Sequence, residues 1–206
     1  MSRNLLVIAG FFSLVASVLY WQWARVDRSD LHALTETGSC AGCNLKGVNL
    51  SGLNLEGADL RRADLSNANL SSTRLVRADL WQANLNGATL DSVDLTGANL
   101  RGLDLRGRNL RKANLTDANL EGANLHNADL KAAVLSNANL SGANLNKASL
   151  ELAILLDANL DQANLWNANL ADANLSSSKL VEVNLVRANL AGADLVNASL
   201  NGSNLS

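Results

Sequence analysis

The two cysteines of the chain stand three residues apart, in the segment Cys40-Ala41-Gly42-Cys43. This spacing allows four kinds of chemistry: thiol-disulfide exchange, haem attachment, zinc binding, or a local structural disulfide. Haem attachment requires a histidine directly after the second cysteine, and this chain has Asn44 there. Zinc needs two further ligands, and a thioredoxin-like site needs a βαβ setting that the surrounding sequence lacks. A structural role in a cap, with a disulfide if the compartment is oxidising, is the favoured interpretation.

No other residues have the types and spacing of a catalytic site. The two histidines, His32 and His126, are far apart in the chain, so neither a metal cluster nor a catalytic triad follows. Carboxylates such as Asp59 and Asp79 recur at equivalent positions of a repeat, which favours solvated surface rows over a general acid and base. The glycines follow the same repeat and form no phosphate-binding loop. We therefore expect no catalytic activity, no cofactor and no metal ion.

Composition excludes several classes of protein. The 206 residues are 48% hydrophobic, which is too apolar for a disordered chain. Seventeen basic and nineteen acidic side chains give a net charge of −2, whereas a general nucleic-acid binder needs a basic excess. Nucleic acid is therefore not expected as a partner.

The first part of the chain, residues 1–28, differs from the rest because it holds an apolar run from Leu5 to Trp23. As a helix this run would be about 28 Å long, close to the thickness of the hydrocarbon core of a bilayer. Its aromatic end, followed by Arg25, is typical of the interfacial end of a transmembrane helix. We favour an uncleaved membrane anchor, and the alternative is a secretory signal cleaved near Ala16. The flanking charges do not fix an orientation.

Residues 29–43 are expected to form a linker and an N-terminal cap, followed by a repeat domain in residues 44–206. In that domain every fifth residue is leucine, from Leu45 to Leu205, without an insertion. Alanine stands two places before 23 of the 33 leucines, and Asn or Asp stands directly before 26 of them. A helix would spread these leucines around all its sides, and a flat strand would send successive leucines to opposite faces. Each five-residue unit must therefore turn a corner, which predicts a coil with leucine inside.

The repeated unit, Ala-Asp-Leu at residues 58–60 and Ala-Asn-Leu at residues 118–120, resembles the pentapeptide-repeat family. The resemblance implies an all-β solenoid, a right-handed quadrilateral β-helix with four pentapeptides per coil. Leucine and the small residue two places before it then point inward. With four units per coil, residues 43–205 make about eight coils in a rod about 39 Å long. In this register Cys40 stands at a leucine position and Cys43 at a small-residue position, so both side chains are expected to point inward in the first coil.

Large residues at the small inward site mark places where the regular structure is expected to change. They are Leu53, Leu103 and Arg108. A charged side chain cannot lie unpaired in a leucine core. Either Arg108 turns outward at a bulge eased by Gly107, or it pairs inside with Asp104. We predict a local irregularity near the middle of the rod, and the alternative is a functional anion site at Arg108.

Side chains twenty residues apart stack on neighbouring coils, so outward columns can be assigned from the sequence. One column holds Arg61, Trp81 and Arg101, in which arginine is expected to stack on the indole, with Arg62 alongside. Trp166 is expected to be a lone exposed aromatic residue. Charge also differs along the rod, because residues 44–112 carry ten basic and seven acidic groups and residues 113–206 carry four and nine. The alternative to a partner-binding surface is a solvated surface with a modest charge asymmetry.

A second candidate partner surface is aliphatic. Val134 and Ile154 replace the outward Asn or Asp, lie twenty residues apart, and have Leu152 and Leu156 beside them. A cluster of exposed aliphatic side chains suggests contact with another protein or with a second copy of the chain. The alternative is that these side chains line a mobile neighbour or occupy an expendable surface.

These features lead to one functional hypothesis and one alternative. The hypothesis is a non-catalytic, membrane-anchored scaffold or protein-interaction module, with its repeat domain on the periplasmic or lumenal side, or secreted if the signal is cleaved. A Cys-x-x-Cys entry into the repeats resembles lumenal or periplasmic members of the family. The alternative, implied by the same resemblance, is a regulator of a DNA-handling enzyme such as a topoisomerase, which the near-neutral charge and the apolar run oppose. The resemblance also implies a homodimer formed through the C-terminal coil.

Overall fold

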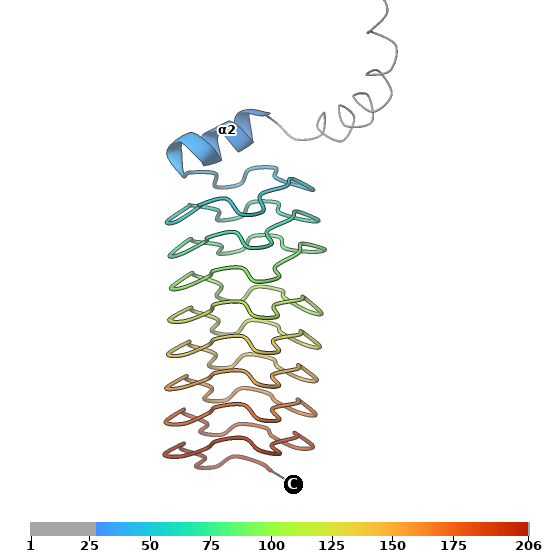
Figure 1. Ribbon diagram of the computed structural model, residues 1–206, viewed down its shortest axis with the longest axis vertical. Coiled ribbons are helices and arrows are strands. Elements are labelled where there is room, and N and C mark those ends of the chain that lie inside the picture. Colours follow the sequence, from blue (N-terminus) through green and yellow to red (C-terminus); the bar gives the residue numbers. More distant parts are fainter. Residues whose placement is uncertain (1–27, 206) are drawn as a thin grey trace, which may run out of the picture.

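A computed structural model describes residues 28–205 of the chain (Figure 1). The segment predicted to be a membrane anchor or signal lies outside the described residues, except for Arg28, with which helix α2 (Arg28–Thr37) begins. Between residues 28 and 205, no helix is both long enough and apolar enough to cross a bilayer. The anchor or signal helix therefore stays a prediction.

From Ser39 onward the chain winds into a stack of coils, and α2 lies across the end of this stack (Figure 1). Parallel bridges join residues twenty positions apart, such as Asn44 with Asp64 and Asn124 with Asn144. Because each pentapeptide makes one side of a coil, this step confirms four pentapeptides per coil. The all-β solenoid, a quadrilateral β-helix of about eight coils, is thus confirmed. Its ladder already includes Ser39, in the segment predicted to be linker and cap.

The corners of the coils are tight turns with a common backbone pattern. The N–H of the small inward residue donates to the carbonyl of the leucine three residues earlier, as from Ala63 to Leu60 at 3.1 Å. The second corner residue has a positive φ, which is +70° at Gly52 and +59° at Arg62. This is the pattern of a type II β-turn, in which glycine is favoured because it adopts positive φ without a steric cost.

The Asn or Asp before each leucine stabilises the corner that follows it. Its side-chain oxygen accepts a hydrogen bond from the N–H two residues later, as Asn139 Oδ1 does from Ser141 at 3.1 Å and Asp129 Oδ1 does from Lys131 at 3.0 Å. Asn and Asp form such local turns readily because their side chains are short and carry an acceptor. The preference for these two residues before leucine therefore has a local physical cause.

The core is a stack of leucine and alanine side chains, of which Ala63 and Leu65 are fully buried examples. Each buried leucine contributes roughly 1.5 to 3 kcal/mol before the entropy of ordering the chain is subtracted. Leucine N–H groups bond to the next coil, as from Leu65 to the Asn84 carbonyl at 2.9 Å. Where a hydroxyl replaces the inward alanine, it bonds to the main chain, as Thr73 does to the Leu50 carbonyl at 2.8 Å.

Helix α2 covers the N-terminal end of the core. Its Leu34 side chain is 1% exposed and packs into the core cluster. Gly38 ends the helix with a φ of +68° and donates its N–H to the Leu34 carbonyl at 3.0 Å, which is the αL type of C-cap. The Asp30 carboxylate accepts the Asn44 N–H at 2.8 Å. In later coils the equivalent N–H bonds to the preceding coil, so α2 takes the place of a coil here.

Candidate interaction surfaces

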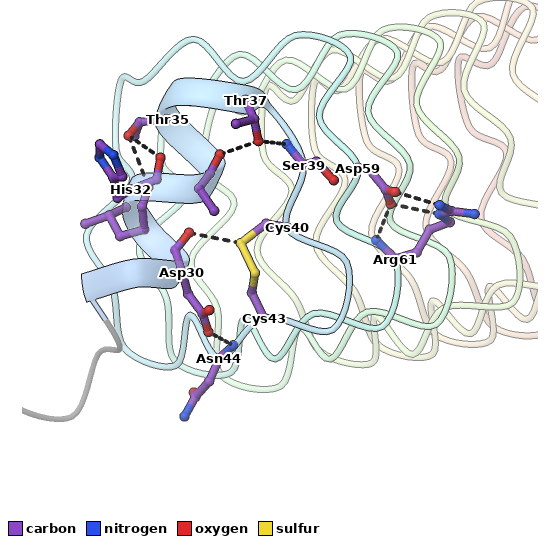
Figure 2. Close-up of a disulfide and its surroundings, with 12 residues drawn as sticks. Asp30, His32, Thr35, Thr37, Ser39, Cys40, Cys43, Asn44, Asp59 and Arg61 are labelled. Carbon is purple, nitrogen blue, oxygen red and sulfur yellow. Dashed lines mark hydrogen bonds and ion pairs between the residues drawn. A yellow bond between two sulfur atoms is a disulfide. The ribbon is translucent and has the colours of Figure 1, made fainter.

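Cys40 and Cys43 form a disulfide at the entry to the first coil, with their Cα atoms 5.2 Å apart (Figure 2). Cys40 is 2% exposed, and Cys43 is half-buried against the same core. Sγ of Cys40 lies 3.1 Å from the backbone oxygen of Asp30 in α2. A disulfide sulfur has no proton to donate, so this is a packing contact that becomes a hydrogen bond only after reduction. The disulfide therefore lies directly under the capping helix.

Metal ligands do not gather around this cysteine pair or elsewhere in the described part of the chain. Across residues 28–205, no group of three or more His, Cys, Asp and Glu side chains has an arrangement that could hold a metal ion. His32 lies on α2 and His126 at a corner of the solenoid. The other candidate sites that the sequence predicts lie on the surface of the rod.

The two arginines predicted to stack on an indole are instead held by carboxylates. Arg61 lies 2.6 Å from Asp59 and 3.8 Å from Asp79. The side-chain hydrogen bond from Arg61 lowers the pKa of Asp59 below its ordinary value. Arg101 pairs with Glu121 at 2.9 Å. The prediction that Arg61 and Arg101 cover the indole was wrong, because ion pairing to neighbouring acidic groups fixes both guanidinium groups.

The cation that covers Trp81 is Arg62, whose guanidinium carbon lies 5.2 Å from the ring centroid. Nε of Arg62 also donates to Oε1 of Gln82 at 3.0 Å. Arg62 has no carboxylate within ion-pairing distance in the described structure, so its charge remains available. An open depression of about 440 Å³ lies at this corner, and it is lined by Ala41, Gly42, Arg61, Arg62 and Trp81.

A similar contact surrounds Trp166, which is half-buried rather than a lone exposed aromatic residue. Lys147 lies 5.7 Å and Arg187 lies 5.6 Å from the centroid of its ring. Sequence reasoning missed this arrangement because it compared residues twenty apart. The cation that covers each indole, Lys147 here and Arg62 at Trp81, stands nineteen residues before it. A comparison of residues nineteen apart would therefore have predicted both contacts between a cation and an indole ring.

The four predicted aliphatic residues are close together on the solenoid. Val134 and Ile154 form a bridge between neighbouring coils on one side of the rod. Ile154 is 40% exposed, and at the two corners that flank this side Leu152 is 48% and Leu156 is 38% exposed, while Val134 is half-buried. We call these four residues the aliphatic patch. Both Val134 and Ile154 lack the side-chain oxygen that elsewhere accepts a corner N–H, so stabilisation of the turn does not explain them.

Arg108 lies half-buried at its inward site, and its Nε donates to the Arg106 carbonyl at 3.2 Å. It does not pair with Asp104, because Arg106 holds that carboxylate at 2.6 Å and, through this hydrogen bond, lowers its pKa. No bulge forms either, since Gly107 has the φ of the other corners, +61°. The irregularity lies instead in the ladder between this coil and the preceding one.

These observations define a β-helical repeat protein with leucine inside and polar, charged and aliphatic columns outside. A family model of pentapeptide repeats matches the chain in eight copies over residues 39–75, 73–111, 99–137, 128–167 and 168–206. The chain belongs to the pentapeptide-repeat family.

Several solved structures are similar to this chain. HetL, a pentapeptide repeat protein involved in heterocyst differentiation regulation in the cyanobacterium Nostoc sp. strain PCC 7120, is 32% identical, with 87% of this chain and 96% of that chain covered and a TM-score of 0.43. A trypsin-treated form of QnrB1, a plasmid-mediated fluoroquinolone resistance protein, is 19% identical over 78% of this chain and 90% of that chain, with a TM-score of 0.58. At this identity, the likeness to QnrB1 shows the fold alone. Among curated proteins the sequence has no significant match.

Proposed function

We propose that the β-helix is a non-catalytic protein-interaction module and that the aliphatic patch is its binding face. The exposed side chains of Leu152, Ile154 and Leu156 carry this proposal. Three large aliphatic side chains on one side and its two corners remove apolar area from water only when another surface covers them. Most units of the repeat hold Asn or Asp at the position of Ile154, and the corner positions of Leu152 and Leu156 mostly hold polar residues or glycine.

The expected partner is a protein surface that combines apolar side chains with Lys or Arg. Asp157 and Asp172 are exposed beside the patch, and neither forms an ion pair with another described residue. The half of the repeat domain that contains them, residues 113–206, has nine acidic and four basic groups. Complementary charge at the rim of an apolar contact steers association and selects the partner.

A photo-crosslinking amino acid at position 154 of the full-length protein tests this proposal in the native host. The matched control carries the same amino acid at position 144, the outward position of the opposite side of the coil. We expect a discrete adduct from position 154 only. Leu152→Asp should remove the adduct, and Asp157→Asn with Asp172→Asn should weaken it and reduce its sensitivity to salt.

Two results would contradict the proposal. One is equal labelling from positions 154 and 144, and the other is a position 154 adduct that Leu152→Asp leaves unchanged. An adduct with twice the mass of the chain would show that the partner is a second copy of the chain and not another protein. Homodimerisation through the C-terminal coil remains a separate prediction.

The second part of the proposal concerns location. We propose that residues 1–28 attach the protein to a membrane and that the repeat domain faces an oxidising compartment, periplasmic or lumenal. The apolar run from Leu5 to Trp23 supports the attachment. The disulfide between Cys40 and Cys43 supports the compartment, because such bonds persist where thiols are not kept reduced. The alternative, a topoisomerase regulator, rests only on the resemblance to the pentapeptide-repeat family.

A further inference from the structure

The ladder of the solenoid is interrupted at one pair of coils. Between residues 39 and 204, bridges join each outward position to the one twenty residues later, except at Asn84 with Asp104 and at Thr89 with Asn109. Six backbone hydrogen bonds of the regular pattern are absent at this place in the described chain. Their donors would be the N–H groups of Gln82, Leu85, Gly87, Leu90, Asp104 and Asn109. We call this interruption the ladder gap.

The ladder gap affects only two of the four sides of the coil. On the other two sides the same pair of coils is joined by bridges from Asp94 to Asn114 and from Asn99 to Asn119. The Leu95 N–H donates to the Asn114 carbonyl at 2.7 Å, as in the regular pattern. The two coils are therefore closed along two neighbouring sides and unpaired along the other two.

Two large inward residues account for the position of the gap. Leu103 and Arg108 occupy the small inward sites on the two unpaired sides, and the preceding coil has Ala83 and Ala88 at the equivalent sites. Inserting larger side chains into a close-packed stack displaces the backbone around them. Arg108 also cannot leave its guanidinium in an apolar core, so the side chain must reach a polar group.

The polar group that Arg108 reaches belongs to the interrupted ladder. Its Nε donates to the Arg106 carbonyl at 3.2 Å. By the regular spacing of nineteen residues, that carbonyl is the acceptor for the Gly87 N–H, a bond that is absent within residues 28–205. Arg108 therefore replaces a bond between coils with a bond inside its own corner.

Solvent exposure agrees with an opening at these two sides. Ala83 is 8% and Ala88 is 5% exposed, whereas Ala123 and Ala128, one coil beyond the gap, are 0% and 1% exposed. Asn84 is exposed as well, although outward Asn residues in the middle of the rod are mostly half-buried. Water thus reaches the coil edge at the gap.

We propose that the ladder gap is a hinge that divides the rod into two stacks, residues 39–100 and residues 101–205. The stacks separate further on the two unpaired sides and remain joined along the two intact sides. A coil of a solenoid contacts only its neighbours, so the free energy of opening at one interface depends on the bonds of that interface. An interface without six of its hydrogen bonds opens at a lower free energy than the intact ones.

Hydrogen exchange of the full-length protein tests the hinge. We expect the amides of Leu85, Leu90 and Asn109 to exchange at least about tenfold faster than their equivalents one coil later. The double variant Leu103→Ala with Arg108→Ala restores small inward residues. Its amides at these sites should become as protected as those of the intact interfaces, and its Tm should rise.

Val93→Ala is the matched control, because Val93 is a buried inward residue larger than alanine on a side where the ladder is intact. This variant should lower the Tm and leave exchange at the gap unchanged, since it only creates a cavity. Wild-type amides at the gap as protected as those of the other interfaces would overturn the proposal. So would a double variant that exchanges like the wild type.

Distances between spin labels test the motion itself. Labels at positions 64 and 144 span the gap on an unpaired side, and labels at positions 59 and 139 span the same number of coils on an intact side, about 19 Å in each case. A hinge predicts a broad distribution of distances for the first pair, a narrow one for the second, and narrowing of the first pair in the double variant. Equally narrow distributions would contradict a hinge.

Discussion

Asn139 shows how one outward side chain stabilises a corner of the β-helix. Its Oδ1 accepts the Ser141 N–H at 3.1 Å. Asn139→Ala leaves that N–H without its acceptor, so we expect the free energy of unfolding to fall by about 1 kcal/mol. Asn139→Asp keeps an acceptor oxygen and serves as the control, with a smaller loss expected. Chemical denaturation measures both, and equal losses would show that the hydrogen bond does not stabilise the corner.

Carboxylates with a lowered pKa make the stability of the rod depend on pH, and Asp59 and Asp104 are two of them. Hydrogen bonds from Arg61 and Arg106 hold the pKa values of Asp59 and Asp104 below the ordinary value. Because the unfolded chain binds the proton more readily, these carboxylates stabilise the fold above their unfolded pKa. Their contribution is lost as the pH falls through the lower folded pKa.

We therefore expect the Tm to fall below about pH 4. Asp104→Asn should lower the Tm at neutral pH and make the fall in acid shallower, because one of the carboxylates that take up a proton is gone. Thermal melts followed by circular dichroism across this range measure both effects. Curves of wild type and variant that run parallel in acid would contradict the role assigned to Asp104.

The period of five predicted that the leucines face inward, and the family resemblance added the small residue two places before each leucine. Neither predicted which cation covers which indole. The spacing of twenty places Arg61 beside Trp81, but the carboxylates of Asp59 and Asp79 bind Arg61, and Arg62 takes its place. Competition between an ion pair and a ring contact depends on side-chain positions within a few ångströms, which a repeat pattern does not contain.

At the scale of elements, helix α2 and the disulfide together close the N-terminal end of the core. The disulfide holds the first corner under α2, where Leu34 is buried and Asp30 accepts the Asn44 N–H. We expect replacement of Cys40 and Cys43 by alanine to cost about 2 kcal/mol, the value for a loop this short. Hydrogen exchange should then show faster exchange in α2 and the first coil only. Unchanged stability and exchange would mean that the helix alone closes the core.

The repeat pattern does not by itself determine the number of units per coil or the form of a local irregularity. A period of five requires a corner in each unit, but the number of units per coil came from the family resemblance and only then from bridges twenty residues apart. Arg108 predicted an irregularity, but the kind of irregularity depends on side-chain packing, which the repeat pattern does not describe. The corner at Gly107 has the regular backbone, and the ladder to the preceding coil is interrupted instead.

For the whole molecule, the charge distribution along the rod bears on where a partner would bind. The repeat domain changes from three net positive charges in residues 44–112 to five net negative charges in residues 113–206. If residues 1–28 anchor the chain, the positive half lies nearer the membrane and the acidic half, with the aliphatic patch, lies farther away. A partner would then meet the patch at a distance from the bilayer of several coils, each about 4.8 Å thick.

Cell fractionation combined with a thiol-alkylation gel shift tests this arrangement on the full-length protein. We expect the protein in the membrane pellet after carbonate extraction, with no alkylated cysteine before reduction and two after it. Val15→Arg with Leu19→Arg interrupts the apolar run and should release the protein from the membrane, because a charged residue in the hydrocarbon core costs several kcal/mol. A shorter soluble chain with oxidised cysteines would support the cleaved signal. Soluble, full-length protein with free thiols would overturn the anchored, extracytoplasmic location and return attention to a regulator inside the cell.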